Sequence, residues 1–357
     1  MLQFKPGYFI FIICVSIICL CSCNEKKEER QIERSFYYWK SVFTLTGFEK
    51  KLLDSLRVKT IYLKFFDVDW IEPAKGPVPV ARLTVNEASV ASLRAAGTNN
   101  FKFNVIPVIF ITNECISKID TSQIAALGDH ISDLTFKLIS ANAFNDISEI
   151  QFDCDWTGST REKYFALIRQ FKKRFTQTPL SATIRLHQIK FISKTGTPPV
   201  DRGLLMCYNM GNLKDPATKN SILETEELKK YTGNLSRYPL PLDIALPLFD
   251  WKVLYRNNLY TGLIQHLPGT AFNHTFSKKT GNRYVIIKDT LLEGYDLRKG
   301  DMIRDEQSHI TEILAAAKAI SGQLKNTQTR VSLYHLDSLI LSKYTTHELE
   351  SIYNSLH

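Results

Sequence analysis

The sequence predicts an α/β protein in which eight parallel strands close into a (β/α)8 TIM barrel, with one insertion after the seventh strand. Short apolar runs of strand character alternate eight times with mostly helical connections over residues 36–357. The alternative is an open, doubly wound sheet, and it is disfavoured because no Gly-rich phosphate loop follows any of these runs. The chain has 357 residues, of which 44% are hydrophobic and 11% aromatic, so one large core can be filled.

The predicted elements follow from periodicity, because apolar residues recur every second position in a half-buried strand and every three to four in a helix. The strands are 36–43, 60–66, 103–111, 149–156, 180–186, 202–210, 242–248 and 330–336. The helices are 48–56, 122–143, 160–175, 221–235, 309–324 and 346–357. Residues 255–307 lack helical period and contain a hairpin pattern at 283–288 and from 291 onward, which indicates the insertion.

The first 35 residues are predicted to be a targeting segment and a tether. Lys5 precedes an apolar run at 8–20, which is too short for a comfortable membrane span. The run leads into Leu20-Cys21-Ser22-Cys23, which resembles a bacterial lipobox, so 1–22 is the expected signal peptide and Cys23 the lipidated residue. An ordinary signal peptide or an uncleaved anchor is the alternative. The charged stretch 23–35 is the expected tether before the barrel at 36–357.

Acidic residues soon after Cys23 resemble the export signal of Bacteroidetes-type lipoproteins. The resemblance implies a lipid-anchored protein of the outer membrane or cell surface, with a periplasm-facing position as the alternative.

Charge and cysteine content exclude several other classes of protein. The formal net charge is +9, but the basic residues are scattered and no nucleic-acid-binding motif occurs, so no nucleic-acid partner is expected. Four of the seven cysteines lie in the signal segment, which leaves Cys115, Cys154 and Cys207. Three is an odd number and no CxxC spacing occurs, so neither a disulfide framework, nor a zinc site, nor a cofactor is expected.

Polar and aromatic residues recur where the predicted strands end, and in a barrel these ends meet at one mouth. The fourth strand shows the pattern best, because period two places Asp153 and Asp155 opposite Phe152 and Cys154. Carboxylates beside aromatic rings are typical of a sugar site, since the rings stack on sugar C–H surfaces and the acids bind hydroxyls. The tryptophans could instead cap the core. The predicted substrate-binding residues are Trp39, Asp69, Trp156, Arg185, Asn209, Asp250, Trp251 and His335.

Two motifs make the prediction specific. Asp153-Cys154-Asp155-Trp156-Thr157 resembles the D-x-D-W-E end of strand four in the chitinase-like glycoside hydrolases of family 18. Met206-Cys207-Tyr208-Asn209 resembles the strand-six motif M-x-Y-D of the same family. The resemblance implies a TIM barrel in which Asp153, Asp155 and Tyr208 occupy catalytic positions and the two acids orient the acetamido group of the substrate.

The chain departs from this family at the residue that should protonate the glycosidic oxygen. That position holds Thr157, and a hydroxyl with a pKa far above neutral cannot act as a general acid. Asn209 likewise replaces an Asp. Either another acid substitutes, with Asp69, Glu114 and Asp250 as candidates by position, or the chain binds a glycan without cleaving it.

Two further alternatives concern the mouth. Residues 255–307 could plug it, which would suit a structural scaffold. A divalent metal is the rival ligand, with possible ligands at Asp67, Asp69, Asp153, Asp155, His187, His335 and Asp337, although no H-E-x-x-H spacing supports it. If Asp153 and Asp155 both point into the lumen, their like charges should raise the pKa of one of them, and Asp153 should share a proton with Asp155 or pair with Arg185.

Overall fold

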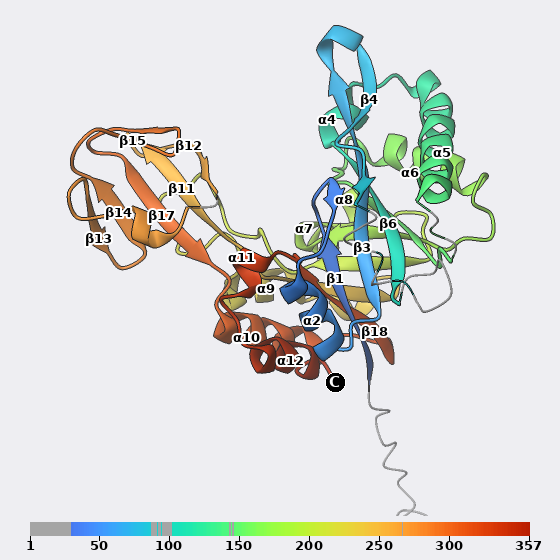
Figure 1. The fold of residues 1–357 in the computed structure, drawn as a ribbon. Helices are drawn as coiled ribbons and strands as arrows, with labels where there is room; N and C mark the ends of the chain where they lie inside the picture. The colour runs from blue at the N-terminus through green and yellow to red at the C-terminus, as the bar shows by residue number, and fades with distance from the viewer. Residues whose placement is uncertain are drawn as a thin grey trace, which may run out of the picture.

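The computed structural model describes residues 30–86, 91, 94, 102–142, 144, 146–265 and 267–357. The expected signal peptide, the lipidation site Cys23 and the tether up to residue 29 lie outside the described residues. Within the described part, a barrel forms the body of the molecule and an antiparallel sheet projects from it to one side (Figure 1).

Eight parallel strands form the barrel, as predicted. They run in the order β1, β18, β10, β9, β8, β7, β6 and β3, and β1 also pairs with β3, so the sheet closes on itself. Their bounds are β1 Gln31–Tyr38, β3 Thr60–Ile71, β6 Asn104–Ile111, β7 Ile150–Asp153, β8 Leu180–Arg185, β9 Arg202–Met206, β10 Leu242–Pro247 and β18 Gln328–Tyr334. The closed parallel sheet confirms the predicted (β/α)8 fold and excludes the open alternative.

The first strand begins earlier than predicted. Residues 31–35 were expected to be tether, but they belong to β1 and pair with residues 328–332 of β18. The charged side chains that suggested solvent exposure have partners. Glu33 accepts a hydrogen bond from Arg330 Nε at 2.7 Å, and Arg34 Nη1 lies 3.3 Å from Glu350. An ion pair from β1 to β18 and another from β1 to helix α12 (Thr346–Asn354) therefore allow a polar sequence to form a barrel strand.

Helices follow most of the barrel strands and pack on the outside of the sheet. The longer ones are α2 Gly47–Ser55, α5 Ile124–Ala141, α6 Arg161–Lys172, α9 Thr225–Thr232, α10 Ile310–Ser321 and α12 Thr346–Asn354. Shorter ones are α4 Asn113–Lys118, α7 Leu186–Lys190, α8 Ile192–Thr195 and α11 Ser338–Leu341. Capping boxes begin α2 at Thr46 and α12 at Thr345, where each hydroxyl accepts a backbone N–H three residues on. Among the described helices, none is long and apolar enough to cross a bilayer.

The lower part of the barrel lumen is filled by an ionic cluster around Arg330. Its guanidinium donates to Glu33 at 2.7 Å, to Glu149 at 3.1 Å and to the Tyr62 hydroxyl at 2.9 Å. Asp243 accepts the Arg330 backbone N–H at 2.7 Å. Burial raises the pKa of Asp243 to about 6, although Arg330 and a second guanidinium oppose the shift. These paired side chains occupy the lumen at the end where the barrel strands begin, and the candidate site lies toward the other end.

The insertion lies between β10 and β18, as predicted, and starts at Asp250. Its main sheet runs in the order β12, β11, β17, β14 and β13, with antiparallel neighbours. The bounds are β11 Asp250–Arg256, β12 Leu259–Ile264, β13 Ser277–Thr280, β14 Arg283–Ile286 and β17 Met302–Gln307, with a separate pair β15 Thr290–Leu292 and β16 Tyr295–Leu297. The predicted hairpin between 283–288 and the residues from 291 onward is wrong, since β14 pairs with β13 and β17.

The insertion has a small hydrophobic core of its own, which includes Leu254, Tyr284 and Ile303. It projects sideways in Figure 1, while β3 continues past the barrel and forms a hairpin with β4 (Gly76–Val80) at the top of the view. A short pair, β2 (Val42–Phe43) with β5 (Thr84–Val85), completes the sheets. Both projections begin at the carboxyl-terminal ends of barrel strands, so they flank the mouth.

Candidate functional site

Strand β7 and the residues just after it carry three polar side chains in sequence toward the mouth. Alternation along the strand places Gln151, Asp153 and Asp155 on the lumen side. Gln151 is completely buried, accepts a hydrogen bond from the Tyr37 hydroxyl and donates to Ser181 Oγ at 3.3 Å. This satisfied amide forms a layer above the ionic floor, and the two carboxylates lie beyond it.

The two carboxylates have different surroundings. Asp153 is 5% exposed and accepts a hydrogen bond from Thr183 Oγ1 at 2.6 Å. The Asp155 side chain is 54% exposed and forms an ion pair with Arg185 Nε at 3.3 Å. Strand parity therefore places one acid inside the mouth and the other at its surface, where a ligand would meet it first.

Burial raises the pKa of Asp153 to about 7, and the charge of Asp155 adds to the shift. Thr183 and Arg185 oppose it, and Asp67 contributes a small further increase. The raised pKa agrees with the direction predicted from like charge, but desolvation is the larger cause. Arg185 pairs with Asp155, and its effect on Asp153 is electrostatic, so the direct Asp153–Arg185 pair suggested by the sequence is replaced.

Tyr208 and Asn209 follow β9 at the neighbouring part of the mouth. Tyr208 is 3% exposed, and its hydroxyl has no hydrogen-bond partner among the described residues. Burial raises its pKa, and Asp153 is one of the charges that act on it. Asn209 has a φ of 54°, a left-handed conformation that Asn adopts more readily than most residues. A buried hydroxyl of this kind can donate to a ligand oxygen that enters the mouth.

Aromatic rings surround this polar centre. The Tyr334 ring lies 5.3 Å from Tyr208, 5.8 Å from Phe249 and 5.9 Å from Trp39. Trp251 extends the group, with its ring 5.2 Å from Phe249. Phe249 and Tyr334 were not among the predicted site residues, although each stands at the end of a barrel strand, and that position was the available signal.

Trp156 was predicted to bind substrate, and the structure contradicts this. The side chain is completely buried, stacks on Tyr164 with ring centroids 5.2 Å apart and donates Nε1–H to the Thr195 carbonyl at 2.9 Å. It shares its strand face with Phe152 and Cys154, so it packs against helix α6 on the outside of the barrel. The period-two rule already implied this orientation.

Thr157 occupies an exposed position after β7. Its hydroxyl lies 2.9 Å from Ser159 Oγ and 3.3 Å from Thr160 Oγ1, in a hydroxyl cluster that holds no acid. Helix α6 starts directly after this cluster. The strand end therefore carries hydroxyl groups, and no acid, at the position where the sequence resemblance would require a proton donor.

The three acids proposed as substitutes lie in separate surroundings. Asp69 accepts hydrogen bonds from Thr112 Oγ1 at 2.9 Å and from the Trp70 backbone N–H at 2.8 Å. Glu114 is 59% exposed and pairs with Lys118 at 2.8 Å on helix α4. Asp250 forms an ion pair with Lys343. Each of these three carboxylates forms a hydrogen bond or an ion pair with a neighbouring residue. Asp153 is the acid of the site whose pKa lies near neutral.

The insertion fixes the orientation of Trp251. Its indole N–H donates to Glu306 Oε2 at 2.6 Å, and the same oxygen accepts the Ser221 hydroxyl at 2.5 Å. The other Glu306 oxygen accepts Arg304 Nε at 2.5 Å, and Arg304 Nη1 donates to the Asp215 carbonyl at 2.7 Å. Sequence reasoning missed this network because its members come from three separate segments.

The metal alternative lacks support in the described residues, where no three His, Cys, Asp or Glu side chains are grouped to hold an ion. His335 lies beside Tyr334 with ring centroids 5.2 Å apart. Asp337 caps α11 and pairs with Lys40 at 2.6 Å. Burial lowers the pKa of His187, which stands just after β8. These residues line the mouth or its rim without converging on one point.

Comparison with known proteins places the fold. No protein-family model and no curated protein matches the sequence. Among solved structures, a chitinase from Chromobacterium violaceum is 10% identical, with a TM-score of 0.52 over 91% of this chain and 97% of the other. The spore cortex-lytic enzyme SleL from Bacillus cereus is 14% identical, with a TM-score of 0.52 over 92% of this chain and 75% of the other. SleL from Bacillus megaterium is 13% identical, with a TM-score of 0.53 over 91% of this chain and 75% of the other.

The chain therefore has a closed eight-stranded barrel similar to those of the chitinase and the SleL enzymes. At 10% to 14% identity the likeness establishes the fold alone.

Proposed function

We propose that the barrel mouth binds a glycan, and that the chain does so without the general acid used by the chitinase-like enzymes. The observation that carries the proposal is the cluster of Asp153, Asp155 and Tyr208 inside a ring of aromatic side chains, with Thr157 in place of the acid. The barrel fold supports it, because glycans are the substrates of the family whose barrel this chain shares.

The chemistry of the mouth suits a sugar. Trp39, Phe249, Trp251 and Tyr334 present ring surfaces on which pyranose C–H groups can stack. Asp155 is exposed enough to accept hydrogen bonds from sugar hydroxyls or from an acetamido N–H, and the buried Tyr208 hydroxyl can donate one. A few convergent polar groups in an aromatic setting are the usual composition of a small-molecule site.

Hydrolysis is the second candidate, and one observation favours it. Because the pKa of Asp153 is raised to about 7, this carboxyl keeps a proton near neutral pH and could donate it to a leaving oxygen. Asp153 lies four residues before Thr157, deeper in the barrel, so the glycosidic oxygen would have to enter further than in an enzyme that uses the strand-end Glu.

Calorimetric titration with chito-oligosaccharides tests binding, and reducing-end release from the same sugars tests hydrolysis. We expect Asp155→Asn to keep the fold and to weaken binding at least about tenfold, because it removes a charged acceptor at the surface of the site. The matched control is Asp133→Asn on helix α5, which removes a 62% exposed acid that also pairs with an arginine, Arg174. Equal affinity of wild type and Asp155→Asn would place the binding site elsewhere.

The hydrolysis candidate has its own test. If Asp153 is the proton donor, Asp153→Asn abolishes release of reducing ends while the affinity for the oligosaccharide stays within a few-fold of wild type. Binding without turnover in the wild-type protein would reject hydrolysis and leave the binding proposal in place.

We further propose that the chain is a lipoprotein anchored through Cys23 at the outer membrane or cell surface. The support is the sequence alone, an apolar run followed by a lipobox-like Cys23 and a charged stretch. Metabolic labelling with a fatty-acid analogue should mark the wild-type protein and miss Cys23→Ala. Equal labelling of the two would reject the lipid, and surface proteolysis of intact cells would separate an exposed position from a periplasm-facing one.

A further inference from the structure

The chain enters the barrel at the end opposite the mouth. Arg30 is held there by its guanidinium, which donates to the carbonyls of Asn326 at 3.1 Å, Leu324 at 3.1 Å and Leu356 at 2.6 Å. Strand β1 starts at the next residue, and because the barrel strands are parallel, all of them start at this face. We call it the entry face, meaning the loops that precede β1, β3, β6, β7, β8, β9, β10 and β18.

The entry face carries exposed basic side chains. They lie in the loops before β3, β6, β8, β10 and β18, namely Arg57, Lys59, Lys102, Lys173, Arg237 and Lys325. None of the six forms an ion pair with another described residue. Lys172 lies beside Lys173 but pairs with Asp201 at 3.2 Å, and the exposed acids Asp54 and Asp146 offset the positive charge only in part.

The two ends of the barrel therefore differ in charge. At the mouth Asp67 and Asp155 are paired with Lys64 and Arg185, and near the entry face Glu149 and Asp243 are paired inside the barrel with arginines. The difference in charge therefore comes from the six cations of the entry face that lack an ion-pair partner among the described residues. A separation of this kind orients a protein at a charged surface, because the field acts on the whole barrel. The basic entry face would meet an anionic surface and the mouth would point away from it.

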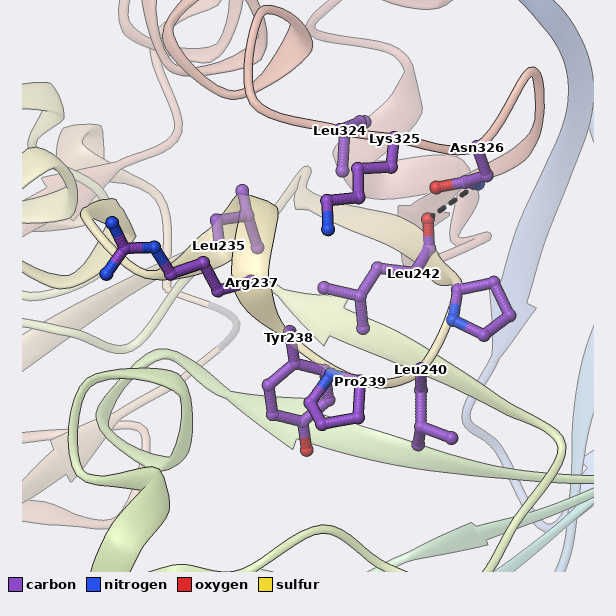
Figure 2. Close-up of a pocket in the computed structure, with 10 residues that line it drawn as sticks. Leu235, Arg237, Tyr238, Pro239, Leu240, Leu242, Leu324, Lys325 and Asn326 are labelled. Atoms are coloured by element: carbon purple, nitrogen blue, oxygen red, sulfur yellow. Dashed lines mark hydrogen bonds between the residues drawn. The ribbon is translucent and has the colours of Figure 1, made fainter.

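A pocket opens on the entry face beside the chain entry (Figure 2). Its volume is about 360 Å³, and its apolar lining comes from residues around the start of β10, including Tyr238, Leu240 and Leu242. Lys325 extends over it from the loop before β18, whereas the guanidinium of the lining residue Arg237 points away from Lys325 (Figure 2). An apolar floor with a cation above it suits a lipid, whose phosphate can meet Lys325 while its glycerol and first methylene groups lie on the floor.

We propose that the entry face rests on an anionic phospholipid bilayer, so that the mouth is held open to the medium on the far side of the molecule. The inference rests on the proposed lipid attachment at Cys23 for its biological setting. Residues 23–29 can span at most about 25 Å, so an anchor there would keep the entry face close to the lipid surface. One acyl chain alone gives marginal membrane binding, and a basic patch is a second signal that makes it stable.

The test uses vesicles and needs no lipid on the protein. The chain from residue 23, with Cys23→Ser, contains every strand of the closed barrel, since β1 starts at Gln31. We expect this chain to sediment with vesicles of phosphatidylglycerol and phosphatidylcholine in equal parts, to release from them as salt is raised, and not to sediment with phosphatidylcholine alone. Each basic residue near such a surface strengthens binding about fivefold.

The decisive variant is Lys59→Glu, Arg237→Glu, Lys325→Glu, which should lower the affinity for the mixed vesicles by about 100-fold or more. The control triple reverses Lys75, Lys288 and Lys299, which are exposed cations on the β3–β4 hairpin and the insertion, and it should bind as the unchanged chain does. Circular dichroism checks that both variants remain folded.

Three results would overturn the proposal. The first is that the entry-face variant binds as tightly as the unchanged chain. The second is that the control triple loses as much affinity as the entry-face variant, which would mean that net charge alone matters. Absence of sedimentation with the mixed vesicles would reject the bilayer and favour a protein partner for the pocket. Because the vesicle assay contains no acylated protein, its outcome is independent of the labelling test at Cys23.

Discussion

Asp153 should make the stability of the barrel depend on pH in a way that one substitution can remove. Its pKa is about 7 in the folded chain, against 3.8 for an ordinary Asp. A group whose pKa is raised on folding contributes its full stability below the unfolded pKa and loses it as pH rises through the folded pKa. Between about pH 4 and pH 7 the unfolded chain releases this proton while the folded chain keeps it, so stability falls across that window.

The magnitude follows from the shift. A difference of about three pKa units corresponds to about 4 kcal/mol, because one unit is worth 1.36 kcal/mol at 25 °C. Asp153→Asn cannot ionise, and its amide oxygen can still accept the hydrogen bond from Thr183. We therefore expect the variant and the wild type to have similar free energies of unfolding near pH 4, and the variant to be more stable by several kcal/mol at pH 8.

Urea unfolding followed by tryptophan fluorescence at pH 4, 5, 6, 7 and 8 measures the difference directly. The difference in the free energy of unfolding between variant and wild type cancels the contributions of the other titrating groups. These include Asp243, whose pKa is also raised. The same series on Asp133→Asn controls for loss of an acid at the surface. A difference between Asp153→Asn and wild type that stays constant from pH 4 to pH 8 would show that Asp153 is ionised in the folded chain and would refute the reasoning.

Two further substitutions test packing around the site. Trp156→Ala should lower the free energy of unfolding by about 3–5 kcal/mol, because a completely buried ring and its hydrogen bond are lost, and it should leave glycan affinity unchanged in the fraction that stays folded. A loss of affinity with little loss of stability would return Trp156 to the site. Glu306→Gln should cost about 3–5 kcal/mol, because Arg304, also completely buried, loses its charged partner. Both are measured by urea unfolding, with the 81% exposed Glu226→Gln as the control for Glu306→Gln, and an equal effect of these two Gln variants would contradict the buried pair.

The barrel was predictable because its signals are local. Each strand is a short apolar run, and each longer helix has a one-sided apolar pattern within a single segment. The boundary between the tether and the barrel could not be predicted in this way. Residues 31–35 look like a polar stretch unless Glu33 is known to meet Arg330, nearly 300 positions away. Side-chain pairing across a closing seam cannot be read from a window of ten residues.

The site was predictable in its acids and less so in its aromatic residues. Period two placed Asp153 and Asp155 in the lumen, and it would have excluded Trp156 had the same rule been applied to that residue. Phe249 and Tyr334 looked like ordinary core residues, because an aromatic side chain at a strand end is as common in packing as in binding. The hydrogen bond from Trp251 to Glu306 depends on how the insertion folds back, which is set by the tertiary structure and not by the local sequence.

Contacts between Arg30, just before β1, and the residues after helix α12 hold the two ends of the described chain together. His357 Nδ1 lies 2.9 Å from the Arg30 carbonyl oxygen, and the Arg30 guanidinium binds the Leu356 carbonyl. The barrel is thus nearly circular as a polymer, and it should tolerate a change in where the polymer is cut. A short linker could join residue 357 to residue 30, with new ends opened at the Asn257–Asn258 turn, where both residues have positive φ. Such a permuted chain would keep all eight barrel strands, and any anchor attached to its new start would hold the molecule by the insertion beside the mouth and no longer by the entry face.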